Sequence, residues 1–216
     1  MPTYPLAYLL TFTSYGTRLH GHLDGSVTVR VNEPGTPRLD ANSDLMAENE
    51  NRMKYPSCLL NSADRAVVLE AICQTCAFRN WDLLTAHVRS THVHAVVQAL
   101  TEPERILHGM KSYSSRSLNR LNPYLHRAHR WTRHGSTRYL WNHSDVLAAL
   151  DYVINQQGRP LALYVSQAAQ LPASRNCGLG LAALPPLHDC RSSLSGLSHC
   201  PPLHDCRGSP SGPKQV

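Results

Sequence analysis

Two histidines separated by one apolar residue, His92 and His94, lie inside the β-branched segment Thr-His-Val-His-Ala-Val-Val-Gln over 91–98. Successive side chains of a strand point to opposite faces, so both imidazoles should project from the same face. Two imidazoles side by side on a rigid strand can grip a metal ion. A lone pair of this kind more often marks polar residues on the wet face of a sheet, so its meaning depends on the rest of the chain.

Tyr152 and Gln156 lie one helical turn apart in a helix predicted from Ser144, its expected N-cap, to about Gln157. The residues expected to form its buried face are Val146, Leu147, Leu150, Val153 and Ile154. Tyr152 and Gln156 would then share a stripe away from the core. Taken alone, an exposed tyrosine and glutamine are common on helices.

The histidine pair and the Tyr152 helix together predict a nuclease site. A divalent ion held by two imidazoles and one amide oxygen keeps open positions for a substrate phosphate and neutralises charge in the transition state. A tyrosine near the amide ligand can attack phosphorus in line, giving a covalent phosphotyrosine and a free 3′ hydroxyl. The protein–DNA link stores the bond energy, so no nucleotide cofactor is needed and another 3′ hydroxyl can rejoin the strands.

The elements that must position these residues follow from hydrophobic periodicity. Strands are predicted at 6–13, 81–88, 92–100 and 139–141, and helices at 62–79, 102–120 and 144–157. The first strand has little polar interruption and should be central, and Asn61 or Ser62 would cap the first helix. This order predicts an α+β fold, a ferredoxin-like (RRM-like) sandwich of an antiparallel sheet with helices on one face.

The 216 residues divide into a predicted domain over 1–165 and a tail over 166–216. The domain contains a surface insertion at about 20–60 with one short strand expected at 27–31. The tail is rich in Pro, Ser and Gly and repeats Pro-Pro-Leu-His-Asp-Cys-Arg at 185 and 201. We expect it to be disordered, and a tandem duplication explains the repeat better than a zinc-binding tract does.

Charge and cysteine content bound the class of protein. The formal net charge is +6 and the pI about 9.1, which favours a polyanionic partner, nucleic acid before an acidic membrane. No stretch approaches the roughly 20 apolar residues of a spanning helix. The N-terminus lacks a secretory signal and the seven cysteines are an odd number, so we expect a cytoplasmic protein without a disulfide framework. The motif Cys73-Gln74-Thr75-Cys76 is interpreted as two buried helical cysteines rather than half of a zinc site.

Basic residues cluster in the 102–120 helix and in the basic, aromatic block at 122–138. The candidate DNA-binding residues are Arg105, Lys111, Arg116, Arg127, Arg130, Trp131 and Arg133. Arginines interleaved with aromatic rings suit single-stranded nucleic acid, where bases stack and phosphates pair with guanidinium groups. The helical set could equally be a solvated face, and Trp131 could equally belong to the core.

The pairing of His92-Val93-His94 with Tyr152-Val153-Ile154-Asn155-Gln156 resembles the single-tyrosine HUH transposases, including the REP-associated tyrosine transposases. The segments at 7–17, 80–94 and 130–140 are similar to further blocks of that family, so the resemblance covers about 6–160. It implies a ferredoxin-like nuclease that uses Mg²⁺ or Mn²⁺ to cleave and rejoin single-stranded DNA near hairpins, in a bacterial cytoplasm, as a monomer or a homodimer. Carried over, His92, His94 and Gln156 would be metal ligands and Tyr152 the nucleophile.

Several alternatives stay open. Many REP-associated relatives carry Asn-Pro late in the tyrosine helix, whereas here Asn155 precedes Gln156, so Asn155 competes as third ligand. Tyr113 is a weaker candidate nucleophile because Ser117, not an amide or carboxylate, lies four residues later. A domesticated, catalytically inert hairpin-binding protein would keep the same basic surface. An RNA-binding ferredoxin-like module fits poorly, because its central strands would carry exposed aromatic residues where this chain has histidines.

Overall fold

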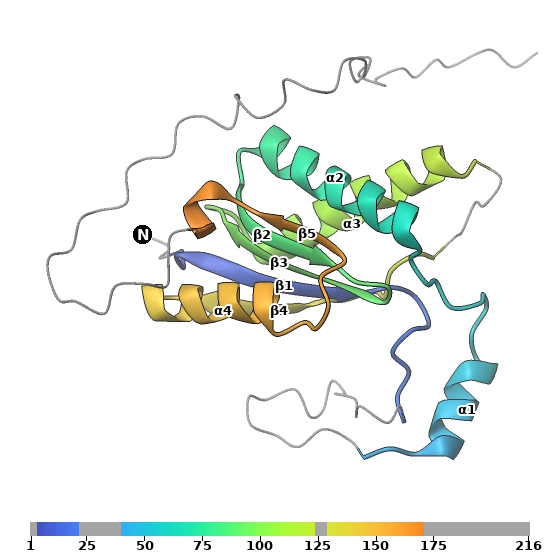
Figure 1. Ribbon diagram of the computed structural model, residues 1–216. Coiled ribbons are helices and arrows are strands. Elements are labelled where there is room, and N and C mark those ends of the chain that lie inside the picture. Colours follow the sequence, from blue (N-terminus) through green and yellow to red (C-terminus); the bar gives the residue numbers. More distant parts are fainter. Residues whose placement is uncertain (1–3, 22–39, 124–128, 171–216) are drawn as a thin grey trace, which may run out of the picture. The chain divides into compact units, whose positions relative to one another are not determined.

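The computed structural model describes residues 4–21, 40–123 and 129–170. Five antiparallel strands form one sheet in the order β4-β1-β3-β2-β5 (Figure 1). The strands are β1 (Ala7–Thr13), β2 (Asp82–Val88), β3 (His92–Gln98), β4 (Ser136–Leu140) and β5 (Ala162–Val165). The order of the first four strands is that of a ferredoxin-like fold, and β1 lies inside the sheet as expected. The predicted α+β class is therefore confirmed, with β5 as an additional strand beside β2.

The helices are α1 (Ser43–Asn51), α2 (Ser62–Arg79), α3 (Pro103–Leu121) and α4 (His143–Asn155), followed by the short 3-10 helix η1 (Gln167–Gln170). Asn61 caps α2 in a reciprocal capping box with Asp64. The prediction of Ser144 as the cap of α4 is wrong. The Asn142 side chain accepts from the Asp145 amide at 2.9 Å, and the Ser144 hydroxyl only supports that oxygen.

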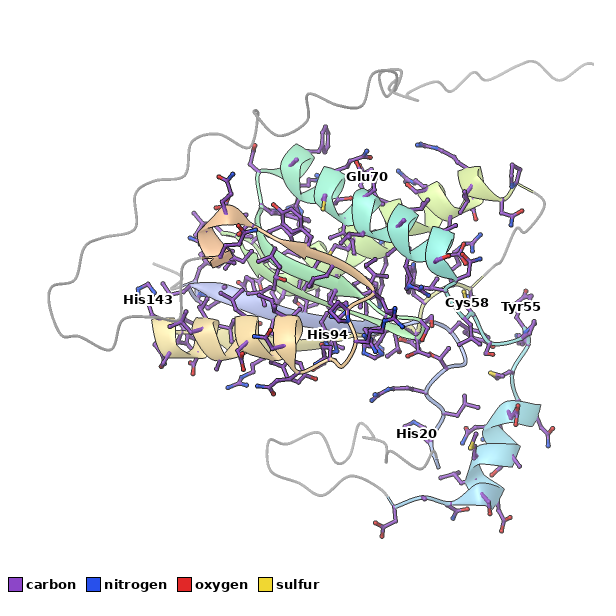
Figure 2. All side chains as sticks on the ribbon, viewed as in Figure 1. His20, Tyr55, Cys58, Glu70, His94 and His143 are labelled. Atoms are coloured by element: carbon purple, nitrogen blue, oxygen red, sulfur yellow. The ribbon has the colours of Figure 1, made fainter. Side chains whose placement is uncertain are left out.

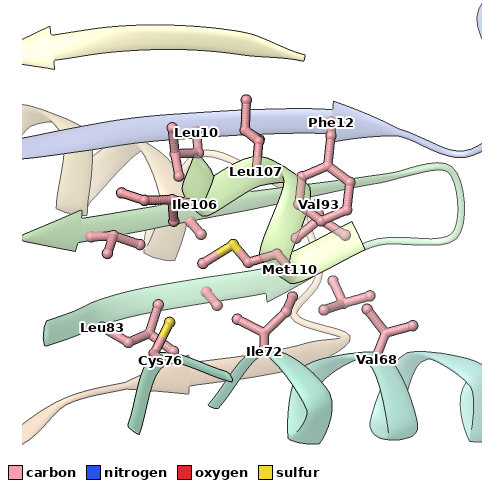
Figure 3. Close-up of a cluster of buried hydrophobic side chains, with 14 of the residues drawn as sticks. Leu10, Phe12, Val68, Ile72, Cys76, Leu83, Val93, Ile106, Leu107 and Met110 are labelled. Carbon is pink, nitrogen blue, oxygen red and sulfur yellow. The ribbon is translucent and has the colours of Figure 1, made fainter. Parts of the chain in front are cut away.

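The main core lies between the sheet and the pair α2 and α3 (Figure 3). Tyr8, Leu10 and Phe12 of β1 enter it from one strand, and alternate residues of β3, Val93, Ala95 and Val97, enter it beside them. Burial on this face follows the period of two that a strand imposes. It leaves the intervening residues of β1 and β3 on the opposite face.

That opposite face is covered by α4, which contradicts the prediction that the helices lie on one face only (Figure 1). A second cluster holds Ala7, Val96, Leu140, Ala149, Leu150 and Val153. Leu147 lies outside the strip of α4 that contacts the sheet and is 66% exposed, so its predicted place in the core is wrong. The apolar stripe of α4 is narrow because the helix covers only part of that face.

Some predictions fall outside the described residues: the strand at 27–31, Arg127, and the repeat tail beyond residue 170. The chain divides into two units, Met1–Arg175 and Asn176–Val216. Within the first, β5 ends at Val165 and only η1 lies past the predicted boundary at 165. In the part of the chain that the structure describes, no helix combines the length and the apolar character that a membrane crossing needs.

Candidate active site

The two histidines of β3 project to the face that α4 covers, and Figure 2 labels His94 there. Val93, between them, is buried in the core on the other side. The imidazole centroids of His92 and His94 are 4.7 Å apart, and His94 is only 6% exposed. The predicted common orientation of the pair is confirmed.

Each imidazole is held at Nδ1 by a threonine hydroxyl. Thr11 Oγ1 lies 2.8 Å from His94 Nδ1, and Thr91 Oγ1 lies 2.9 Å from His92 Nδ1. Thr11 reaches His94 because the two residues pair directly between β1 and β3. With Nδ1 engaged on both rings, Nε2 is the nitrogen left to bind a ligand, and such outer hydrogen bonds are what fix a metal-binding histidine.

Burial keeps both imidazoles neutral. Desolvation, with the positive charges of Arg18 and Arg89, lowers the pKa of His92 to about 4. Desolvation and the neighbouring His92 lower the pKa of His94 to about 3. A neutral imidazole is the form that binds a metal ion, so the pair is ready for one at neutral pH. Arg18, which the sequence interpretation missed, brings positive charge beside the pair.

Tyr152 lies against the histidine pair. Its ring meets the His94 ring edge to face with centroids 5.3 Å apart, and the side chain is 38% exposed. Figure 2 shows His94 beside the C-terminal end of α4. The phenol is thus next to an imidazole and still open to solvent, as a nucleophile for a large substrate must be.

The two amides considered as third ligand from the sequence are both turned elsewhere. The Asp151 carboxylate accepts from Asn155 Nδ2 at 2.8 Å and from Gln156 Nε2 at 2.7 Å. These two hydrogen bonds lower the pKa of Asp151. The structure therefore does not bring Gln156 to the histidines.

Gln157 occupies that place instead. Its side chain lies close enough to both imidazoles for hydrogen bonding to raise the pKa of each, and its Nε2 donates to the Tyr152 carbonyl oxygen at 3.1 Å. Gln156 was chosen by helical spacing from Tyr152, but α4 ends at Asn155 and Gln156 is its C-cap, so that spacing does not apply there. Among the described residues no three His, Cys, Asp or Glu side chains gather around one point.

The sequence matches a known family over its central part. The model of the family described as Transposase IS200 like covers residues 47–156, just over half of the chain. This chain belongs to the IS200-like transposases. The match includes His92, His94, Tyr152 and Gln156, and it confirms the family resemblance predicted from these residues.

Two solved structures are similar to this transposase at low sequence identity. One is a REP-associated tyrosine transposase bound to a REP hairpin, 9% identical with a TM-score of 0.40 over 70% of this chain and 66% of that chain. The other is a candidate transposase from Deinococcus radiodurans R1, 13% identical with a TM-score of 0.38 over 71% of this chain and 92% of that chain. The transposase thus spans just under two thirds of the first structure's length. No curated protein matches it.

Two of the predicted DNA-binding residues of this transposase are half-buried and hydrogen-bonded within the protein. The Trp131 indole Nε1 donates to the Lys111 carbonyl oxygen and to Ser115 Oγ, and the ring packs edge to face on Phe12 at 5.1 Å. Lys111 Nζ donates to the carbonyl oxygens of Thr132 and His134, at 2.9 and 2.8 Å. Of the two interpretations left open for Trp131, the structure favours the core.

The other predicted DNA contacts are differently placed. Arg105, Arg116 and Arg133 are exposed, whereas Arg130 donates to Asn119 Oδ1 through Nε and Nη2. The Arg116 guanidinium lies 5.2 Å above the Tyr113 ring. Because α3 packs on the sheet face opposite the histidines, Tyr113 is not part of this site. The exposed arginines stay predictions as phosphate contacts.

Proposed function

We propose that this transposase is a metal-dependent endonuclease and strand transferase that cleaves single-stranded DNA near hairpins through a 5′-phosphotyrosine. The observation that carries the proposal is the contact between Tyr152 and His94, whose Nδ1 is held by Thr11. A nucleophile beside a paired imidazole ligand is what such a reaction needs. We place the activity in the domain predicted over 1–165, to which η1 adds contacts.

The residues present suit a divalent ion. His92 and His94 would bind through Nε2, because Nδ1 of each ring is already bonded to a threonine. Gln157 would supply the third ligand, with the sequence-predicted Gln156 as its competitor. Two imidazoles and an amide oxygen fit Mg²⁺ or Mn²⁺ with open positions for substrate. When bound, such an ion would polarise the scissile phosphate and neutralise its developing charge.

Bond making and breaking balance within the DNA and Tyr152. The phenol oxygen forms the new bond to phosphorus, and the bond from phosphorus to the 3′ oxygen breaks. The phenol gives up its proton and the departing 3′ oxygen takes one up. The reverse attack by a 3′ hydroxyl releases Tyr152 and joins the strands, so no external energy source is required.

Positive charge on the molecule supports a nucleic acid substrate. The net charge is +6, and Arg18 and Arg89 lie close enough to His92 to lower its pKa. Guanidinium groups near the histidine pair would hold the phosphates that flank the cleaved bond. The hairpin in the proposed substrate rests on the family resemblance.

The test is a cleavage assay with labelled single-stranded DNA from the flanking genomic sequence, in Mn²⁺ or in EDTA, using the full chain. We expect a metal-dependent, SDS-resistant protein–DNA adduct that Tyr152→Phe abolishes and Tyr113→Phe retains. Hairpin binding without an adduct in either condition would overturn the nuclease proposal in favour of an inert hairpin-binding protein.

A further inference from the structure

A third histidine, His87 of β2, lies beside the pair on the same face of the sheet. It is fully buried, and it pairs in register with His94 of β3 on one side and Leu163 of β5 on the other. Burying an imidazole without partners is costly, so the hydrogen bonds of this ring should reveal its purpose.

Both nitrogens of His87 hold backbone atoms from outside its own strand. Nδ1 lies 3.1 Å from the Val153 carbonyl oxygen, and the Leu161 amide lies 3.2 Å from Nε2. A backbone N–H can only donate, so Nε2 accepts and the proton of the neutral ring is on Nδ1, which donates to Val153. Arg89 Nη1, at 3.5 Å, also faces Nε2.

The two backbone groups bracket the segment that carries the site. Val153 follows Tyr152 directly, and its carbonyl belongs to the last turn of α4, where helices leave carbonyls without partners. Leu161 comes just before β5, after the connection that contains Gln157. One buried ring therefore ties both ends of the Tyr152–Leu161 segment to the strand next to β3.

We propose that His87 is a positioning residue that fixes Tyr152 and Gln157 against the His92–His94 pair. It would touch neither DNA nor metal, and would act only through the backbone that it holds. The inference that this matters for DNA cleavage rests on the proposed function. The anchoring of the segment does not, and it can be measured without any reaction.

The test uses two amide substitutions of His87, each of which keeps one of the two hydrogen bonds and removes the other. In His87→Asn the side-chain nitrogen can take the place of Nδ1 and keep the bond to Val153, whereas in His87→Gln the amide reaches the place of Nε2 and keeps the bond to Leu161. Thr85→Val is the matched control, because it removes another buried bond from β2, from Thr85 Oγ1 to the Tyr164 carbonyl oxygen at 2.7 Å. Amide hydrogen exchange and adduct formation at saturating DNA would be compared in the four full-length proteins.

In the last turn of α4 we expect faster amide exchange for His87→Gln but not for His87→Asn. At the Leu161 amide we expect faster exchange for His87→Asn but not for His87→Gln. Adduct formation by His87→Gln should be slower by about 10- to 100-fold with unchanged DNA affinity, as a small misplacement of a reacting group predicts. His87→Asn should restore most of the rate, and Thr85→Val should keep it even if its melting temperature falls equally.

Identical exchange patterns in the two amide variants, or an equal loss of rate in Thr85→Val, would overturn the proposal. Absence of an adduct in the unaltered protein would instead refute the proposed function. In that case the exchange patterns alone decide whether His87 holds the segment.

Discussion

The Tyr152 ring stands edge to face on the His94 ring, with 5.3 Å between the centroids. Edge-to-face contact is a favourable arrangement for aromatic rings and restrains both of them. The candidate nucleophile and a candidate metal ligand are thus held together by the protein itself, before any DNA arrives. Tyr152 contacts His94 through its ring and not through its hydroxyl. A substitution that removes only the hydroxyl would therefore remove the attacking oxygen and keep the packing.

Tyr152→Phe should therefore abolish the covalent adduct and leave the site otherwise intact. The ring and its contact with His94 remain, while the attacking oxygen is lost. Mn²⁺ affinity by titration and hairpin affinity by gel shift should match those of the unaltered protein. An adduct that persists in this variant would mean that another nucleophile acts.

Gln157→Ala should weaken Mn²⁺ binding more than Gln156→Ala does. The Gln157 side chain lies close enough to both imidazoles to raise their pKa values, whereas Gln156 Nε2 donates to the Asp151 carboxylate at 2.7 Å. The two variants remove the same atoms from neighbouring residues, so isothermal titration with Mn²⁺ compares them directly. A larger loss in Gln156→Ala would assign the ligand to the residue four positions after the tyrosine.

Thr11→Val and Thr91→Val should each lower metal affinity by about 10- to 100-fold, the usual effect of losing the outer partner of a ligating histidine. Both changes keep the side-chain volume and free one Nδ1. Thr13→Val is the control, since Thr13 bonds Thr132 instead of a histidine. Equal losses in all three variants would show a general effect on the sheet.

Local patterns in the sequence were enough to predict the frame of the site. The helix at 62–79 and the hairpin before and after Arg89 depend on caps, turns and short-range periodicity. The strand β5 was missed because its four residues are all half-buried and show no period. In α1 no residue is buried, so no apolar stripe signalled it.

The hydrogen bonds that hold the site residues in place could not be predicted in the same way. Thr11 meets His94 across 83 residues of sequence, and His87 meets Val153 across 66. Such contacts depend on the register of strands, which a single sequence does not fix. Gln157 was overlooked because helical spacing was applied to a residue just beyond the helix end.

Acid should destabilise the metal-free protein before its carboxylates titrate. The pKa of His92 is about 4 and that of His94 about 3 in the folded state, both below the ordinary 6.5. The unfolded chain therefore takes up protons first, so this stabilisation is complete above pH 6.5 and is lost as the pH falls toward 4. Urea unfolding at pH 7 and pH 5 should show that the free energy of unfolding falls less in His94→Asn than in the unaltered protein. Equal losses in both proteins would contradict the assignment.

Lys111→Met should lower the free energy of unfolding by about 1–3 kcal/mol, since it removes the hydrogen bonds from Nζ to the carbonyl oxygens of Thr132 and His134. It should not change the salt dependence of DNA binding. Replacing an exposed arginine, Arg105, Arg116 or Arg133, by glutamine should leave the stability unchanged. It should reduce the slope of log DNA affinity against log salt concentration by about 1. Fluorescence anisotropy at several salt concentrations distinguishes the two effects, and a reduced slope in Lys111→Met would return that residue to the DNA surface.

The distance in sequence between the parts of the site has a consequence for synthesis on the ribosome. The candidate metal-binding histidines need β1 and β3, whereas the proposed nucleophile comes with α4 and is held in place only when the Leu161 segment has emerged. Contacts between remote segments form late in folding. A growing chain would thus acquire the histidine pair well before Tyr152, so the capacity to break a strand would arrive only with the last part of the domain.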